Sequence, residues 1–286
     1  MLSLQEIEQH FTAWANNEQD LRAAVVVGSQ ARRDHPADEW SDLDIILFAR
    51  QVSQYQDSSA WIEALAPVWV SIPGRTVAGE AERLVLFASG LQVDFVFNDV
   101  AVLQGVAQLA ASGQLPETVH RGVRVLFDKD HAIPALPEPG KPPAQPAPSP
   151  EAFRQAWERF WFGAVHAAKQ LRRNDLAFYK GAEQGLRHLL LPFLEWRTRA
   201  ALGWETDTWH NGRFMSEWLE ARIYSRLAET YTPLEPEACW QGLLGLVSLG
   251  QSTARETAEA LGFPYPLEIE GQMAQYIQQL FNSRRA

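Results

Sequence analysis

Two aspartates at the start of an apolar run are the residues whose type and spacing best suit chemistry in this chain. Asp42 and Asp44 flank Leu43, and the run continues to Phe48. Side chains two apart in a strand face the same side, so both carboxylates should project together while Leu43 points into the core. Carboxylates this close repel each other unless a cation lies between them, and such oxygen ligands suit Mg²⁺ or Mn²⁺. We therefore predict a metal site at these two aspartates.

A glycine and a serine end the preceding apolar run. Gly28 permits close approach of the backbone to a ligand. Ser29 offers a hydroxyl and, with its neighbours, backbone N–H donors that favour phosphate where a helix begins. Arg32 and Arg33 follow and could neutralise further negative charge. The Gly-x-x-x-x-Gly-Lys-Ser/Thr spacing of a Walker A loop is absent, so a different kind of phosphate site is expected.

Asp94 is the candidate for a third carboxylate. In the run 91–97 the odd positions are apolar, and Asp94 is the charged residue on the opposite face of this predicted strand. It could share a metal and accept a proton from an attacking hydroxyl. An Asp-x-Asp pair alone is also common as exposed charge at the start of a strand. The prediction therefore depends on the combination of the Gly-Ser turn, the Asp pair and the later strand aspartate.

The elements that must position these residues alternate between helix and strand up to about residue 131. Apolar periodicity predicts helices at 4–14 and 99–111, and strands at 23–27, 43–48, 68–72, 84–88, 91–97 and 123–127. Pro73-Gly74 should end the third strand, and Ser89-Gly90 should turn a hairpin. This pattern predicts an α/β (α+β) domain with a mixed sheet.

The rest of the chain differs in character. Eight prolines lie in residues 132–150, which favours an extended linker. Beyond it, apolar residues recur at helical spacing, and Asn174 or Asp175 could cap one helix. We expect helices at 153–168, 176–196 with a kink at Pro192, 213–230, 235–249 and 252–261. The predicted domains are therefore 1–133, a linker at 134–150, and an all-α bundle at 151–286.

Composition narrows the class of protein. The chain has 286 residues, a net charge of −10 and a pI of about 5.2, which argues against a nucleic-acid binder and favours small or cationic partners. The single cysteine excludes an intrachain disulfide and a Cys-rich zinc site. The sequence starts with no signal-peptide pattern and contains no apolar run long enough to span a membrane, so we expect a cytoplasmic protein. The oligomeric state is not determined by sequence.

Several motifs together resemble a known family. Gly28-Ser29 followed by Ser41-Asp42-Leu43-Asp44-Ile45 resembles the signature of the polymerase β-like nucleotidyltransferase superfamily. More narrowly, the chain resembles the streptomycin-type aminoglycoside 6-adenylyltransferases over most of residues 1–220. The narrower likeness lies in the segments 123–130, 160–161, 177–180 and 194–196. The chain departs from the family at Gln30, where an arginine is frequent, and at Gly181, where an acidic residue is expected.

The resemblance implies a nucleotidyltransferase domain followed by a helical domain that binds substrate. It implies transfer of AMP from ATP to an antibiotic hydroxyl, with two Mg²⁺ ions and release of pyrophosphate. Asp42 and Asp44 would hold the metals, and Asp94 would be a third ligand or the general base. The implied nucleotide-binding residues are Gly28, Ser29, Arg32, Lys129 and, reaching across from the helical domain, Lys180.

Aminoglycosides are polycations, so the implied acceptor pocket should be acidic. The candidates on the helical half are Glu158, Asp175, Glu183 and Glu195. Each could instead lie on a solvated helix face or in a local ion pair, as Glu183 and Arg187 are spaced i, i+4. Two alternatives remain: another hydroxylated acceptor such as a lincosamide, or a nucleotidyltransferase-like antitoxin or binding module. The intact aspartate set and the large helical domain count against the last.

Overall fold

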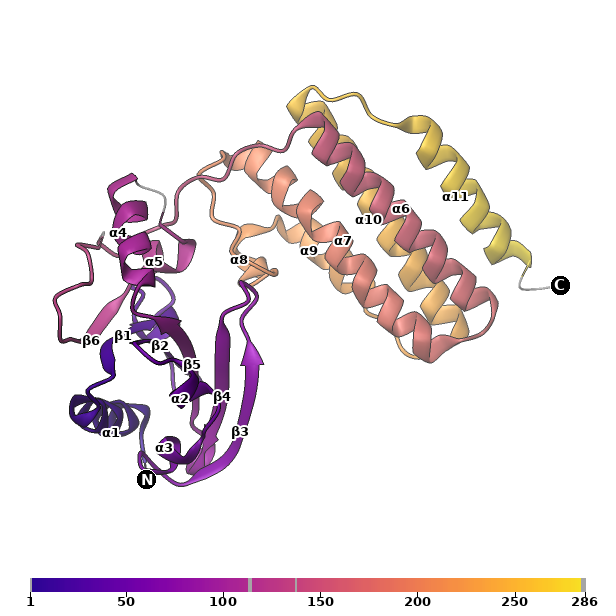
Figure 1. Ribbon diagram of the computed structural model, residues 1–286. Coiled ribbons are helices and arrows are strands. Elements are labelled where there is room, and N and C mark those ends of the chain that lie inside the picture. The colour runs from indigo at the N-terminus through magenta and orange to yellow at the C-terminus, as the bar shows by residue number, and fades with distance from the viewer. Residues whose placement is uncertain (1, 113–114, 137, 284–286) are drawn as a thin grey trace. The chain divides into compact units, whose positions relative to one another are not determined.

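The computed structural model describes residues 2–112, 115–136 and 138–283, and Pro137 of the predicted linker lies outside them. The chain separates into two compact units, Met1–Pro143 and Ala144–Ala286 (Figure 1). Each unit has its own apolar core. Within the described residues, none of the helices combines the length and apolar character that a membrane span requires.

The first unit is built on a six-stranded mixed sheet. Its strand order is β3-β4-β5-β2-β1-β6, in which only the central β2–β5 pair is parallel. The strands are β1 (Leu21–Val27), β2 (Leu43–Ala49), β3 (Val68–Arg75), β4 (Ala81–Phe87), β5 (Gln92–Asp99) and β6 (Arg124–Asp128). The helices are α1 (Leu4–Asn17), α2 (Ser53–Gln56), α3 (Ala60–Glu63), α4 (Val102–Ser112) and α5 (Glu117–Arg121).

Alternation along the strands separates the two faces of this sheet. The helices α1, α2 and α3 contribute Ile7, Tyr55 and Ile62 to a core on one face. Leu103 of α4 packs with Phe48 on the other face. The predicted α/β class with a mixed sheet is therefore confirmed. The short helices α2, α3 and α5 were not predicted, because four or five residues are too few to show a period.

One strand prediction was wrong. Pro73 and Gly74 do not end β3, which continues to Arg75 and pairs with β4 along this stretch. Proline lacks an N–H to donate to a ladder, but β3 lies at the edge of the sheet and has a neighbour on one side only. The hairpin turn at Ser89-Gly90 is confirmed, with both residues at positive φ.

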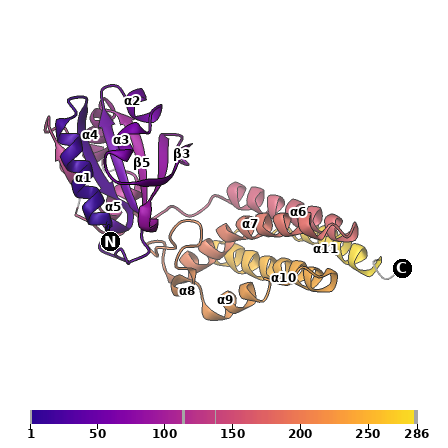
Figure 2. The ribbon, with the colours of Figure 1, turned by 90° about the horizontal axis from the view of Figure 1, so that it is seen from below.

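The second unit is all helical. Its helices are α6 (Pro150–Arg172), α7 (Leu176–Leu202), α8 (Met215–Trp218), α9 (Ala221–Ala228), α10 (Pro236–Leu261) and α11 (Leu267–Asn282). Figures 1 and 2 show α6, α7, α10 and α11 running side by side. Ser149 caps α6 and Asp175 caps α7. Large aromatic side chains from α6, including Trp157, Phe160 and Trp161, fill the core.

The helices of the second unit differ from the prediction in three places. The predicted helices at 235–249 and 252–261 are one continuous α10, in which Gly250 lies against the ring of Phe160. The predicted helix at 213–230 is divided into α8 and α9 at Leu219, whose backbone is extended. The helix α11 was not predicted, although apolar residues at Ile269, Met273, Ile277 and Leu280 recur at helical spacing.

Candidate active site

Three carboxylates meet on one face of the first unit's sheet. β2 begins directly after Asp42, and Asp44 lies two residues further along. The parallel register between β2 and β5 places Asp44 opposite Asp94. One carboxylate oxygen from each of the three residues lies within 4.8 Å of the others. The strand register thus brings together aspartates that are some fifty positions apart.

Apolar packing decides which face these carboxylates occupy. Leu43 and Ile45 of β2 are buried in the core beneath α1. Val93 and Phe95 of β5 are buried in the same core. Because alternate residues of a strand face opposite sides, the aspartates must face the other way. All three are half-buried, so they remain accessible to a ligand.

Partial burial changes the proton affinity of Asp94. Loss of solvation raises the pKa of its carboxyl above the usual value, and the nearby charges of Asp42 and Glu82 raise it further. The amide of Gln92 opposes this shift by donating to Asp94 Oδ1 at 3.1 Å. Gln92 was missed by the sequence analysis, although its position two residues before Asp94 on the same strand face could have indicated it.

Gly28 lies against Asp44, and Ser29 follows it in the same turn. Gly28 has a φ of 70°, and a Cβ at this position would collide with Asp44 Oδ2. Ser29 is 8% exposed, and its Oγ has no hydrogen-bond partner among the described residues. A buried hydroxyl without a partner costs free energy, so it marks a place where a ligand atom would be favourable. Because Gly28 has no side chain, the backbone of this turn can pass close to Asp44.

These residues fit a divalent cation bound with a phosphate group. Three carboxylates supply the hard oxygen donors that Mg²⁺ prefers, and like charges this close are stabilised by a cation. Ser29 leaves a hydroxyl beside them for a further oxygen. The expected helix start is only a three-residue 3-10 turn, Gly28–Gln30, so a helix dipole contributes little to phosphate binding here.

Arg32 and Lys129, which were predicted to bind the nucleotide, both donate to backbone carbonyl oxygens of the first unit. Arg32 Nε donates to the carbonyl oxygen of His35 at 2.7 Å. Lys129 Nζ donates to the carbonyl oxygens of Ala15 and Glu18, each at 2.7 Å, where α1 ends. Desolvation lowers the pKa of Lys129. In the structure Lys129 therefore satisfies the C-terminus of a helix, a role that differs from the nucleotide contact we expected.

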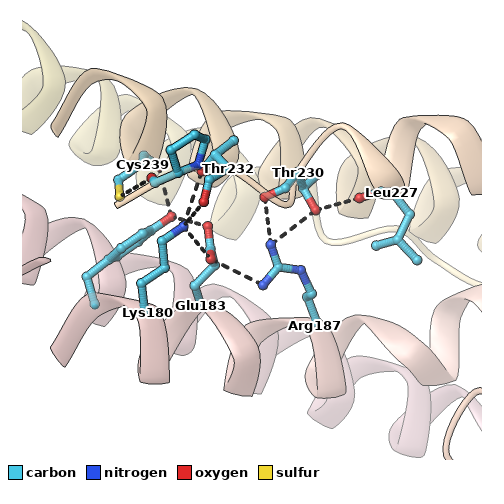
Figure 3. Close-up of polar contacts among 9 residues, drawn as sticks. Lys180, Glu183, Arg187, Leu227, Thr230, Thr232 and Cys239 are labelled. Atoms are coloured by element: carbon cyan, nitrogen blue, oxygen red, sulfur yellow. Dashed lines mark hydrogen bonds and ion pairs between the residues drawn. The ribbon is translucent and has the colours of Figure 1, made fainter. Parts of the chain in front are cut away.

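In the second unit, Lys180 and Glu183 belong to a buried polar network (Figure 3). Lys180 Nζ lies 3.0 Å from Glu183 Oε2 and 2.7 Å from the carbonyl oxygen of Thr232. Arg187 Nη1 lies 3.2 Å from the same carboxylate oxygen. Tyr179 Oη lies 2.8 Å from Glu183 Oε1. Glu183 is 2% exposed, so its environment is a saturated interior site and differs from the open acidic cleft we expected.

The other predicted acceptor residues lie in separate places. Asp175 is exposed and caps α7 by accepting from the backbone N–H of Phe178. Glu158 pairs with Arg154 on the surface of α6 and lines a shallow pocket of about 490 Å³. Glu195 is half-buried further along α7. The helical periodicity correctly placed Glu158 on α6 and Glu195 on α7, but it could not show which neighbours these side chains have.

The sheet and its three aspartates define a class of protein. Asp42 just before a central strand and Asp44 within it, a parallel neighbour that carries a third aspartate, and a preceding Gly-Ser turn are the arrangement expected of a nucleotidyltransferase. The Streptomycin adenylyltransferase family model matches residues 1–280. The chain therefore belongs to the streptomycin adenylyltransferase family, and the enzyme class predicted from the sequence is confirmed.

Individual relatives are distant. The chain is 23% identical over 280 residues to the aminoglycoside 6-adenylyltransferase of Bacillus subtilis (strain 168), which covers 95% of each chain. It is similar to the crystal structure of an aminoglycoside 6-adenyltransferase from Bacillus subtilis, with 19% identity, a TM-score of 0.48, and 98% and 99% of the two chains covered. A nucleotidyltransferase-like protein from Exiguobacterium sibiricum 255-15 is 13% identical, with a TM-score of 0.33 and coverage of 90% and 77%. These likenesses are too weak to define the fold, which is known from the strands and helices of this chain itself.

Proposed function

We propose that the chain transfers AMP from ATP to a hydroxyl of an aminoglycoside, with Mg²⁺ bound at Asp42, Asp44 and Asp94 and pyrophosphate as the second product. The observation that carries this proposal is the convergence of the three carboxylates within 4.8 Å, next to the Gly28-Ser29 turn that contacts Asp44. The matching family model, and a relative named for aminoglycoside 6-adenylyltransfer, support the acceptor class.

Each residue of the aspartate site has a proposed task. Bound Mg²⁺ would neutralise charge on the phosphate oxygens, which is the main requirement of phosphoryl chemistry. Asp42 and Asp44 hold the cation. Asp94 shares it or accepts the proton of the attacking hydroxyl, and its raised pKa makes its carboxylate a better proton acceptor. Ser29 donates its hydroxyl to the triphosphate, and Gly28 keeps the backbone close to the ligand.

The contacts from other positions are also proposals. Lys180 is 26% exposed along its side chain, and we assign its ammonium to the triphosphate. Arg32 adds positive charge after the Gly-Ser turn. Glu158, Asp175 and Glu195 are the proposed carboxylates for the cationic acceptor. Glu183, which is buried against two cations, is instead proposed to hold Lys180 in position.

The test is pyrophosphate release by the purified protein with ATP, Mg²⁺ and a panel of aminoglycosides and lincosamides. We expect release that depends on streptomycin or a related aminoglycoside and is lost in Asp42→Ala and in Asp44→Ala. Asp57→Ala, which removes an exposed aspartate of the same unit, should keep full activity. Release with lincosamides alone would overturn the acceptor class, and no release with any acceptor would overturn the reaction.

A further inference from the structure

A second hollow lies within the helical unit. It is a pocket of about 540 Å³, lined from α7, the 211–215 segment, α9 and the residues that follow α9. This volume is in the range of sites that enclose small molecules. Its apolar lining comes from Leu191, Leu194, Met215 and Leu227.

The polar groups of the pocket are neutral or positive. They include Gln184, His188 and Asn211, together with the guanidinium of Arg187. Among the described residues that line the pocket there is no aspartate or glutamate, although the whole chain contains 35. A polycationic acceptor requires carboxylates, so this lining favours an uncharged or anionic ligand.

Arg187 is the central group. Its side chain is 7% exposed, and its Nε is buried without a hydrogen-bond partner among the described residues. One side of the guanidinium is held by Glu183 and by the carbonyl oxygen of Thr230 at 2.6 Å (Figure 3). Because Glu183 is shared with Lys180, one carboxylate is balanced against two cations. The network therefore keeps an excess of positive charge beside the pocket.

Two tyrosine rings also line this pocket. The guanidinium carbon of Arg187 lies 3.8 Å from the ring centroid of Tyr231, which also lines the pocket and is 62% exposed. Tyr224 contributes a second ring. Side-chain amides beside aromatic rings are suited to planar ligands that carry hydrogen-bond acceptors.

We propose that this pocket binds a planar aromatic molecule with hydrogen-bond acceptors and no positive charge. A nucleobase and an aromatic carboxylate share this chemistry. The pocket would therefore be distinct in specificity from the site that takes the cationic acceptor. The inference does not depend on the proposed AMP transfer, because the binding requires neither metal nor the three aspartates.

Binding to the full chain is measured by calorimetry in EDTA, which keeps the aspartate site free of metal. The probes are adenosine, 4-hydroxybenzoate and streptomycin, one at a time. We expect adenosine or 4-hydroxybenzoate to bind, and to bind equally in Asp42→Asn. Ala228→Trp places a large ring at an exposed position that lines the pocket, and should weaken this binding at least tenfold. Tyr231→Leu, also at an exposed position, should weaken it without filling the space.

Ala221→Trp is the matched control, because it is an exposed alanine of the same helix that does not line the pocket. It should bind the probe as the unchanged protein does. The proposal is overturned if neither aromatic probe binds, if both Ala228→Trp and Tyr231→Leu bind as tightly as the control, or if the control is weakened equally. It is also overturned if streptomycin is the ligand that Ala228→Trp excludes. An absence of pyrophosphate release, measured in a separate assay, would contradict the proposed AMP transfer and would leave the result on this pocket unchanged.

Discussion

At the scale of single residues, the aspartate site depends on small distances. Asp44 lies opposite Asp94 in the parallel register, and Asp42 reaches the same face from just before β2. Gly28 is the residue that permits the turn to pass beside Asp44. Replacing a carboxylate by an amide, or adding one methyl group, at these positions should therefore change activity or stability measurably.

Asp94→Asn removes the charge of the third carboxylate and keeps its shape. We expect ATP binding to persist and turnover with an aminoglycoside to fall by more than tenfold, because the amide is a poor proton acceptor and a weaker metal ligand. Gln92→Ala keeps the carboxylate and removes the amide that donates to it, so its turnover should fall less than that of Asp94→Asn. Turnover of Asp94→Asn within about tenfold of the unchanged protein, or roughly 1.4 kcal/mol in activation free energy, would exclude the role of base.

Gly28→Ala adds a Cβ that collides with Asp44 Oδ2 at a backbone with positive φ. We expect a loss of about 1–2 kcal/mol in the free energy of unfolding from the backbone alone, and a further loss of activity as the carboxylate is displaced. Gly79→Ala separates the two effects, because Gly79 has a φ of 92° with open space around the added atom. Denaturant unfolding and pyrophosphate release measure both. Full activity in Gly28→Ala would contradict the assignment of Asp44.

At the scale of elements, side-chain packing sets how closely two helices approach each other. α10 runs without a break from Pro236 to Leu261, and Gly250 in its interior lies against the ring of Phe160 on α6. A glycine inside a helix costs about 1 kcal/mol relative to alanine. It is retained here because the ring occupies the space of a side chain.

Gly250→Ala should therefore destabilise the helical unit by about 1–3 kcal/mol, since the new methyl group overpacks the contact with Phe160. Gly181→Ala should have the opposite sign. Gly181 is exposed on α7 with open space around it, so alanine should raise the free energy of unfolding by about 0.5–1 kcal/mol. Thermal and urea unfolding of both variants give the comparison. A stabilised Gly250→Ala would show that the ring moves aside at little cost.

At the scale of the whole molecule, the chain consists of two compact units with separate cores. The helical unit is built around α6, which begins with its own cap at Ser149, and its ion pairs join residues of the same unit. A unit that buries its own apolar core and forms its ion pairs internally has what it needs to fold alone.

We expect a fragment of residues 144–286 to fold without the first unit. It should show a helical far-UV circular dichroism spectrum and a cooperative thermal transition. Trp157→Ala, which removes a fully buried ring of its core, should lower the free energy of unfolding of the fragment by about 3–5 kcal/mol. A fragment without a cooperative transition would show that the helical core requires the first unit.

Much of the first unit could be predicted from the sequence because its signals are local. Alternation in β2 and β5 indicates which residues are buried, and the same alternation puts Asp42, Asp44 and Asp94 on the opposite face. Most strands of this unit and its helices α1 and α4 were predicted close to their observed bounds. The family resemblance is confirmed by the family match over residues 1–280.

The sequence by itself determined the class of enzyme, the two kinds of structure along the chain and the three candidate aspartates. Only the tertiary structure decided which partners the charged side chains take. Lys180 meets Thr232, which is 52 positions further on, and Lys129 meets the end of α1 more than a hundred positions earlier. Helical or strand periodicity specifies the face of an element, but the neighbour of that face depends on how distant elements pack. The strand register that joins Asp44 to Asp94 was decided in the same way.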